Sequence, residues 1–446
     1  MNSRRVRHVW PFILCVAVVA VVVAACAAAP TPSAAPVAVA PAPIAAAPAR
    51  PVAAAAPATT PTAAPAAPAA PATAQTEFVA PPPIKFEDAV TRAGRQLFRD
   101  AQAHLGTEPR LLVVDPLIDA NTGGQTVSTA KMGDELESLA KKDFRSYAVT
   151  PLTRNTLATK PLLLIGTLTP VNVERSIDKQ PDAFRVWLTL IDLRTGKVVA
   201  KALDRATVES VNPEPLPFYR DSPTWHKDAT IMGYINSCQV NTKIGDLADP
   251  AYLSRLPAAA VINEAILAYD DGKVPAANGL YKEAQPIADP GDLRVLNGLY
   301  ITNWQMGKKD EARDAFGKLV SSGLELKRLP MKLLFQPGRT TFIAIGDLPA
   351  QYQIWIASLA QQAGKTGSCV RVVGHTSRTG NARANETLSR QRAEAVQRLL
   401  ERDNRALASR LSSSGAGSKE ALVGLGTDDQ RDALDRRVEF RVVDCV

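Results

Sequence analysis

The sequence is poor in the residues that mark several large classes of protein. Its 446 residues include only four histidines, five cysteines and 5% aromatic residues. Scarce aromatics, and basic residues in no run longer than three, argue against a dedicated nucleic-acid surface; the net charge of +8 is compatible with an acidic polymer partner. No His/Cys cluster has the spacing of a metal site, and no Cys/His or Ser/His pair indicates a nucleophilic enzyme. We therefore expect no catalysis, no cofactor and no metal.

Charged residues are almost missing from the first 76 positions, and this pattern begins with a targeting segment. Three arginines among the first seven residues precede an uncharged apolar run, residues 10–25, of about the length of a signal-peptide core. The run ends in "VAAC", and the small residues before Cys26 resemble a bacterial lipobox, in which the cysteine receives lipid and becomes the mature N-terminus. The alternative is an uncleaved membrane anchor, because the apolar run to Ala29 is long enough to span a bilayer.

Both interpretations place the rest of the chain outside the cytoplasm, where disulfides are allowed. We favour a lipoprotein with a signal peptide at residues 1–25 and a lipidated Cys26. Ala27 follows this cysteine, whereas an Asp there is the usual inner-membrane retention signal of enteric-type lipoproteins. The resemblance therefore implies a protein that is anchored by lipid to the cell outer membrane and faces the periplasm.

Residues 26–83 contain the lipidated cysteine and an Ala/Pro-rich linker. Arg50 is the only charge before Glu77. Frequent prolines prevent a continuous helix and favour polyproline II. At ~3.1 Å per residue, such a spacer would reach on the order of 180 Å when extended. We expect it to give the tethered domains reach across the periplasm.

Residues 84–255 have the pattern of an α/β periplasmic domain. The segments "KFEDAVTRAGRQLFRDAQAHL" and "STAKMGDELESLAKKDF" predict amphipathic helices. The runs "RLLVVDPLID", "SYAVTPLT", "PLLLIGTLTPV" and "FRVWLTLIDLRTGKVVAKALDRATV" predict strands, the last with a turn at 194–197. The order β-α-β-β-β predicts an α/β or α+β fold with a mixed sheet. Its strand–helix–strand core and its "LIDLRTGKVV" hairpin resemble the periplasmic lipoprotein domains of the FlgO, LpoB and CsgG type.

Residues 256–330 contain an internal repeat. Two segments, "AYDDGKVPAANGLYKEA" and "NWQMGKKDEARDAFGKL", align at a spacing of 35 residues. Aromatic, glycine, alanine and aromatic positions match in the pairs Tyr269/Trp304, Gly272/Gly307, Ala277/Ala312 and Tyr281/Phe316. This pattern resembles tetratricopeptide helix pairs. Because two repeats are fewer than such folds usually need, we expect the pair to pack on a neighbouring domain and favour a structural spacer over a peptide-binding groove.

Residues 331–446 carry the most specific pattern. Strand-like and helix-like segments alternate from "MKLLFQPGRTTF" to "RRVEFRVVDC". The stretch "GHTSRTGNARANETLSRQRAEAV" followed by "DRRVEF" resembles the OmpA-like peptidoglycan-associating domain, over about a quarter of the chain. The predicted fold class is thus multidomain α/β and α+β: a mixed-sheet periplasmic domain, a short tetratricopeptide-like helical repeat and a C-terminal OmpA-like β-α-β-α-β-β domain.

The helix of this motif raises the question of what Arg392 holds. Leu388, Ala395, Val396 and Leu399 share one predicted apolar face with it, and a buried guanidinium is costly unless something negative meets it. In the family, this arginine pairs with a carboxylate of diaminopimelate in the peptidoglycan stem peptide, a task that suits the bidentate guanidinium. The alternative is an internal salt bridge to Asp429 or Asp435.

The resemblance implies a peptidoglycan-binding site formed by Ser377, Asn385, Leu388, Arg392 and Arg436. One position departs from the family, which normally has Asp directly after "GHT", facing the ammonium group of the ligand; this chain has Ser377. A hydroxyl supplies no formal charge, so we expect weaker binding. Binding of a different stem residue, or loss of binding, also remains open.

The remaining cysteines and His375 complete the site predictions. The OmpA-like fold sets its last strand antiparallel beside the strand that leads to "GHT", which implies a disulfide between Cys369 and Cys445. Cys238 is then left over, either as a buried thiol or as an intermolecular link. We interpret His375 as a structural turn residue rather than a ligand or base.

These observations favour a lipoprotein that tethers or scaffolds a periplasmic assembly to peptidoglycan, with the lipid in the membrane and an unidentified periplasmic protein as partner. The alternative is a regulator of a peptidoglycan synthase, or a component of a secretion, pilus or flagellar machine whose OmpA-like domain binds the wall weakly or not at all. A third hypothesis is a wall hydrolase, but the sequence shows no zinc ligands and no Cys/His or Ser/His pair that would indicate such an enzyme. A MotB-like stator needs an acidic residue in the membrane span, and residues 10–29 contain none.

Overall fold

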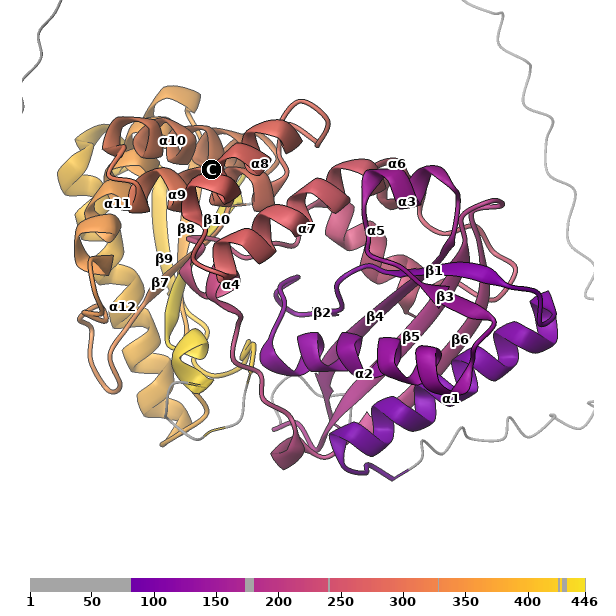
Figure 1. The fold of residues 1–446 in the computed structure, drawn as a ribbon. Coiled ribbons are helices and arrows are strands. Elements are labelled where there is room, and N and C mark those ends of the chain that lie inside the picture. The colour runs from indigo at the N-terminus through magenta and orange to yellow at the C-terminus, as the bar shows by residue number, and fades with distance from the viewer. Residues whose placement is uncertain are drawn as a thin grey trace, which may run out of the picture. The chain divides into compact units, whose positions relative to one another are not determined.

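The computed structural model describes residues 82–172, 180–239, 241–327, 329–423, 426 and 431–445 (Figure 1). The predicted signal peptide, Cys26 and nearly all of the predicted linker lie outside these residues, so they stay predictions. Glu77–Val446 forms one compact unit. Across the described ranges, no helix is long and apolar enough to cross a membrane.

A mixed sheet forms the N-terminal part of this unit (Figure 1). Its elements are α1 (Phe86–Leu105), β1 (Arg110–Val114), β2 (Ile118–Asp119), α2 (Val127–Asp143), β3 (Tyr147–Val149), α3 (Arg154–Ala158), β4 (Leu162–Val171), β5 (Ala183–Asp192) and β6 (Lys197–Ala206). The strand order is β3-β1-β4-β5-β6, and β2 pairs with β4. β1 pairs in parallel with β3 and β4, whereas β4, β5 and β6 are antiparallel neighbours. A mixed sheet is therefore present, as predicted.

Both faces of this sheet are covered, which explains the uninterrupted apolar run of β4. Leu162 and Leu164 belong to a core with α1 and α2. Leu163 and Ile165 belong to a second core with α5 (Ala229–Cys238) and α6 (Pro250–Ser254). Successive strand residues point to opposite faces, so a strand that is buried on both sides is apolar throughout.

The segment "RLLVVDPLID" differs from its prediction as one strand. The structure divides it into β1 and β2, with a break at residues 115–117. Pro116 has no N–H to donate to a strand ladder, and the buried carboxylate of Asp115 accepts a 2.6 Å hydrogen bond from the Tyr252 hydroxyl. The apolar run alone did not reveal this interruption.

Four helices form the middle of the unit: α7 (Leu256–Asp270), α8 (Val274–Ala284), α9 (Leu293–Gln305) and α10 (Lys309–Glu325). Gly272 and Gly307 both have φ of 75°, in the left-handed region that glycine allows, and each lies in the turn that separates two helices. The repeat positions Ala277 and Ala312 are both fully buried between helices. Equivalent positions of the repeat therefore occupy equivalent environments.

A second sheet forms the C-terminal part. Its elements are β7 (Leu329–Leu334), α11 (Leu348–Thr366), β8 (Cys369–Gly374), α12 (Ala382–Asp403), β9 (Leu411–Gly415) and β10 (Arg437–Val443). The strand order is β7-β10-β8-β9. β10 is antiparallel to β7 and β8, and β8 is parallel to β9. Short 3-10 turns lie at Val208–Ser210, Arg405–Leu407 and Arg431–Asp435.

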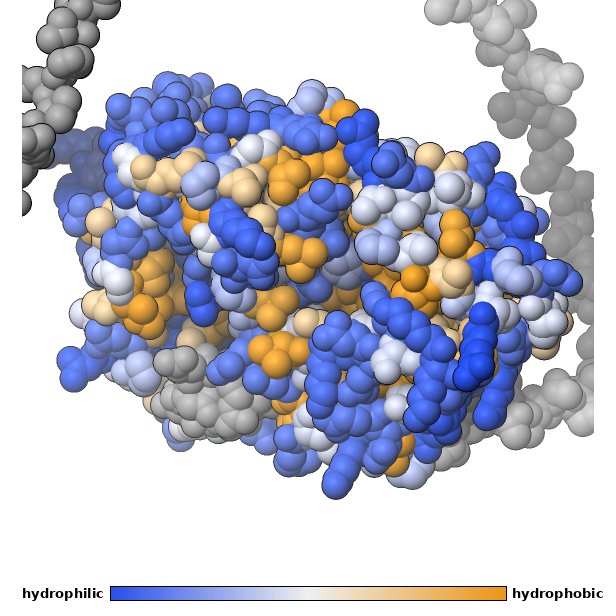
Figure 2. Space-filling view, viewed as in Figure 1, coloured by the Kyte–Doolittle hydropathy of each residue, from blue (hydrophilic) through white to orange (hydrophobic). Residues whose placement is uncertain are grey.

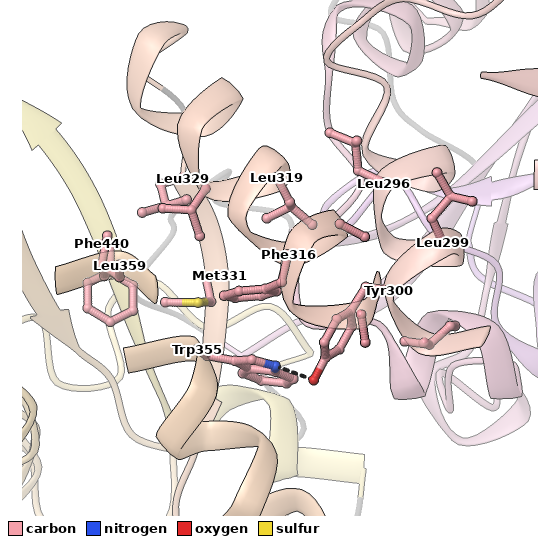
Figure 3. Close-up of a cluster of buried hydrophobic side chains, with 14 of the residues drawn as sticks. Leu296, Leu299, Tyr300, Phe316, Leu319, Leu329, Met331, Trp355, Leu359 and Phe440 are labelled. Atoms are coloured by element: carbon pink, nitrogen blue, oxygen red, sulfur yellow. Dashed lines mark hydrogen bonds between the residues drawn. The ribbon is translucent and has the colours of Figure 1, made fainter. Parts of the chain in front are cut away.

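The middle helices and the C-terminal part share one hydrophobic core (Figure 3). Phe316 of α10 stacks on Trp355 of α11 with ring centroids 5.8 Å apart. The indole N–H of Trp355 donates a 2.7 Å hydrogen bond to the hydroxyl of Tyr300 on α9. This is the packing on a neighbour that a pair of repeats was expected to need. Outside this core, the face in Figure 2 is mostly hydrophilic, with hydrophobic residues in separate patches.

Cys369 and Cys445 form a disulfide in the structure, with Cα atoms 5.3 Å apart and a sequence separation of 76. Cys238, by contrast, is a buried free thiol, and burial raises its pKa to about 11.

We predict that reduction of the disulfide lowers the free energy of unfolding by about 2–4 kcal/mol. The reason is that the unfolded chain gains conformational entropy when the long loop closed by the disulfide is opened. Urea denaturation with and without reductant measures this; two alkylatable thiols at these positions in oxidised protein would contradict the pairing.

Candidate functional site

The predicted site begins where β8 ends. The three residues after Gly374 are buried: His375, Thr376 and Ser377 are 0%, 2% and 4% exposed. The His375 amide donates to the Arg437 carbonyl at 2.8 Å, and the Thr376 amide donates to the Gly417 carbonyl at 2.9 Å. The turn is therefore held by backbone bonds on both sides.

Helix α12 lies directly against the backbone of β8 and β9. A Cβ atom on Gly374 would lie 1.9 Å from the carbonyl oxygen of Ser389, and one on Gly415 would lie 2.5 Å from the Ser389 hydroxyl. The buried Ala393 presents only a methyl group to the same sheet. Small residues on the helix and the two glycines on the strands thus allow the close approach that brings Arg392 to the end of β8.

Arg392 is fully buried and holds three backbone carbonyls. Its Nε donates to the Arg339 oxygen at 2.9 Å, Nη1 to the His375 oxygen at 3.0 Å, and Nη2 to the Gln336 oxygen at 2.9 Å. The guanidinium also lies 5.2 Å from the centre of the Phe335 ring. These bonds join α12 to the end of β8 and to the loop after β7.

The internal salt bridges considered for Arg392 stay open. One carboxylate oxygen of Asp435 accepts hydrogen bonds from the Leu422 and Val423 amides, at 2.6 and 3.1 Å. Asp429 lies outside the described residues. Both the ligand interpretation and the salt-bridge interpretation therefore remain predictions.

Ser377 and Asn385 are joined to each other in the turn that begins at His375, whose carbonyl accepts from Arg392. The Asn385 amide donates to the carbonyls of Ser377 and Thr379, at 3.3 and 2.8 Å, and so joins the first turn of α12 to the turn after β8. The hydroxyls of Ser377 and Thr379 are 3.0 Å apart. Arg436 is buried, and its carbonyl accepts from the Phe335 amide at 2.8 Å.

The buried face of α12 differs from the prediction. Of the expected apolar stripe, only Val396 is buried, whereas Leu388, Ala395 and Leu399 are half-buried. The buried positions are instead Asn385, Ser389, Arg392, Ala393, Val396 and Leu400. The helix turns its small and polar residues to the sheet because the contact at Gly374 leaves no space for leucine. Leu388 is therefore half-buried and does not belong to the buried face of α12.

A half-buried carboxylate that the sequence did not flag, Glu439, lies close to His375. The Glu439 carboxylate accepts 2.7 Å hydrogen bonds from the Trp225 indole and from Nε of Arg437. Burial alone would raise the pKa of Glu439, but the Arg437 charge and these hydrogen bonds outweigh it and lower the pKa to about 2. Glu439 is therefore ionised at neutral pH.

His375 lies beside this carboxylate, with Nε2 3.7 Å from Glu439. Among the described residues, neither ring nitrogen has a hydrogen-bond partner. Burial, followed by the charge of Arg437, lowers the pKa of His375 well below its usual value, so the ring is neutral. A neutral, enclosed imidazole agrees with a structural role. Within the described ranges, no three potential ligand side chains come together to hold a metal.

Comparison with known proteins assigns the C-terminal part of the chain to a family. Residues 334–434 match the OmpA family. The C-terminal part of the chain is an OmpA-like domain. This match covers the β8–α12 junction and Arg392, which supports the resemblance seen in the motif. The rest of the chain, with its mixed sheet and helical middle, lies outside the match.

Solved structures match about a quarter of this chain. The peptidoglycan-associated lipoprotein of Burkholderia pseudomallei is 23% identical, covering 25% of this chain and 89% of that chain, with a TM-score of 0.22. The cell wall anchor of the type VI secretion system of Pseudomonas aeruginosa is 26% identical, covering 24% and 73%, with a TM-score of 0.20. The LpoB C-terminal domain of Salmonella enterica is 12% identical, covering 27% and 98%, also at 0.20. No curated protein matches the chain.

Proposed function

We propose that this chain is an outer-membrane lipoprotein that tethers or scaffolds a periplasmic assembly to peptidoglycan. Its OmpA-like domain would bind a diaminopimelate-containing stem peptide without covalent chemistry. The observation that carries the proposal is the buried Arg392 at the junction of α12 and β8, beside Ser377 and Asn385, in a domain that matches the OmpA family. The proposal includes no catalytic step.

The chemistry of Arg392 supports recognition of a carboxylate. The guanidinium has five N–H donors in a fixed plane, and bonds to three carbonyls hold that plane in place. A preorganised charge in poorly hydrated surroundings attracts an anion more strongly than the same charge in water. A stem-peptide carboxylate at this junction would therefore meet a cation whose position is already fixed, so little side-chain entropy is lost on binding.

Substitution of Ser377 tests recognition of the ammonium group of diaminopimelate. We predict that Ser377→Asp increases affinity for diaminopimelate-type sacculi by roughly ten- to hundredfold, because a bond from an ammonium group to a carboxylate contributes about 1.5–3 kcal/mol. The matched control is Ser412→Asp, which adds the same charge at an exposed position of β9 in the same domain. Co-sedimentation with purified sacculi measures both variants. Tight parental binding that Ser377→Asp leaves unchanged would argue for a ligand other than diaminopimelate.

The lipid anchor is a separate part of the proposal, supported by the small residues before Cys26. We predict that Cys26→Ser releases the protein from membranes or leaves its signal peptide uncleaved. Fractionation and the mass of the N-terminal peptide distinguish the two results. Normal processing of Cys26→Ser, with the parental distribution between membrane and soluble fractions, would refute lipidation at this cysteine.

A second candidate is a regulator of a peptidoglycan synthase, or a secretion, pilus or flagellar component, whose wall contact is weak. Ser377 in place of the family's Asp favours it. In this candidate the tetratricopeptide-like helices could in principle form a groove that binds a protein partner. Their core shared with α11 and β7 supports the structural-spacer interpretation for α9 and α10, since their inner faces are already occupied. Absence of sacculus binding by the parent chain, together with partner binding, would favour this candidate.

A further inference from the structure

The segment between β6 and α5 lies along the edge of the OmpA-like domain. β7 is an outer strand of the four-stranded sheet. The Lys332 amide of β7 donates to the Pro223 carbonyl at 3.0 Å, and Thr224 pairs with Met331 in an antiparallel bridge. The segment thus covers an edge that would otherwise expose unpaired backbone groups.

Trp225 of this segment reaches into the OmpA-like domain. Its side chain is 7% exposed and forms a small apolar cluster with Val423 and Leu434. Its indole N–H donates the 2.7 Å hydrogen bond to Glu439 of β10. A residue from outside the family-matched segment therefore completes the surroundings of the half-buried Glu439 carboxylate.

A short chain of contacts connects Glu439 to the candidate site. Arg437 donates to the same Glu439 oxygen as Trp225, and the Arg437 carbonyl accepts from the His375 amide at 2.8 Å. The His375 carbonyl in turn accepts from Nη1 of Arg392. Three residues, Glu439, Arg437 and His375, therefore connect the Trp225 indole to the Arg392 guanidinium through hydrogen bonds.

A second contact fixes the loop before β10. The side-chain amide of Asn121 donates to the Leu422 carbonyl at 3.0 Å. The Leu422 amide donates to Asp435, which precedes Arg436 of the predicted site. The backbone N–H of Asn121 donates a 3.0 Å hydrogen bond to the Asp119 carboxylate, which holds Asn121 in place. The loop between β9 and β10 is thus attached to the first sheet's β2–α2 connection.

We infer that Trp225 and Asn121 are positioning residues of the candidate wall-binding site, which makes that site's affinity depend on contacts from outside the OmpA-like domain. The inference rests on the proposed function. A protein partner that alters these contacts would change wall affinity, and wall binding would change partner affinity by the same factor. The lipoprotein would therefore couple its two partners instead of binding them independently.

The test uses the full chain with Trp225→Phe, which keeps an aromatic ring and removes the indole donor. Its matched control is Trp187→Phe on β5, because among the described residues the Trp187 indole nitrogen has no hydrogen-bond partner. We expect Trp225→Phe to weaken sacculus binding roughly fivefold or more, which is the scale of ordinary coupling between sites. We expect Trp187→Phe to bind like the parent. Asn121→Ala should weaken binding in the same direction as Trp225→Phe.

Amide hydrogen exchange separates positioning from a general loss of stability. Trp225→Phe should accelerate exchange at the His375, Thr376, Leu422 and Val423 amides and leave the β4 and β5 amides unchanged. Parental affinity in Trp225→Phe, or equal losses in the two tryptophan variants, would overturn the inference. If the parent chain itself fails to bind sacculi, the proposed function is wrong, and the exchange result still decides: unchanged exchange in Trp225→Phe overturns the positioning role.

Discussion

Sacculus binding is expected to fall by more than tenfold when Arg392 is replaced by alanine. Truncating one partner of a buried, hydrogen-bonded charge pair costs about 2–5 kcal/mol of binding free energy. The same change removes the donor for the Arg339, His375 and Gln336 carbonyls, which align the end of β8 with α12. Binding of the full chain to purified sacculi, measured by co-sedimentation, gives the effect.

The control must separate lost binding from lost folding. An unsatisfied buried polar group costs about 1–3 kcal/mol, so Arg392→Ala also destabilises the domain. Arg390→Ala is the matched control, since Arg390 is an exposed neighbour on α12 that pairs only with Glu394 four residues on, at 2.8 Å, in the described contacts. Thermal denaturation shows whether each variant is folded at the assay temperature. A folded Arg392→Ala variant with parental affinity would show that this arginine holds no ligand.

Gly374→Ala is expected to unfold the OmpA-like domain. The added Cβ would lie 1.9 Å from the Ser389 carbonyl oxygen and 3.3 Å from the Ala393 nitrogen, both backbone atoms of α12. The helix would have to leave the sheet, and changes of this kind belong to the rare class that costs about 4–5 kcal/mol or more. Circular dichroism during urea denaturation measures the loss.

Gly279→Ala is the matched control, and we expect this glycine-to-alanine substitution to raise stability where Gly374→Ala lowers it. Gly279 is exposed on α8, and a Cβ there would meet no heavy atom within 4 Å. Alanine in a helix interior is more stable than glycine by roughly 0.5–1 kcal/mol, so this variant should gain stability. A Gly374→Ala variant as stable as the parent would show that α12 does not pack on β8 as described.

The sequence predicted those features that local patterns determine. The apolar run Leu162–Ile165 at the start of β4 indicated a strand, because strands covered on both faces contain near-continuous apolar runs. The glycine of each helix pair marked a turn, and Gly272 and Gly307 have the same left-handed backbone. The OmpA-like motif predicted the neighbourhood of Ser377, Asn385 and Arg392 because its residues lie within one strand–turn–helix segment.

Features that depend on distant contacts were not predictable in this way. Trp225 and Glu439 are 214 residues apart, and no local pattern connects them. Lys332 is buried in β7, where it donates to the Tyr219 carbonyl at 2.9 Å and burial lowers its pKa to about 7. The prediction of which face of α12 is buried was wrong. The sequence suggested that its leucines face the core, whereas packing against Gly374 requires smaller residues there.

The shared core also changes how the tethering function can be tested. Removing residues 331–446 would expose Phe316 and Tyr300, which pack on Trp355 of α11. A truncated chain could then lose activity through misfolding of the helical middle. Single substitutions in the full chain avoid this ambiguity, because they leave the core of Figure 3 intact.

Co-sedimentation of the full chain with purified diaminopimelate-type sacculi, in the presence and absence of a soluble muropeptide competitor, tests whether the OmpA-like domain tethers the protein to peptidoglycan. We predict that the parent chain is found in the pellet and that the muropeptide returns it to the supernatant. We also predict that Arg392→Ala stays in the supernatant while Arg390→Ala does not. A parent chain that stays in the supernatant at every sacculus concentration, while folded by circular dichroism, would contradict peptidoglycan tethering by the OmpA-like domain.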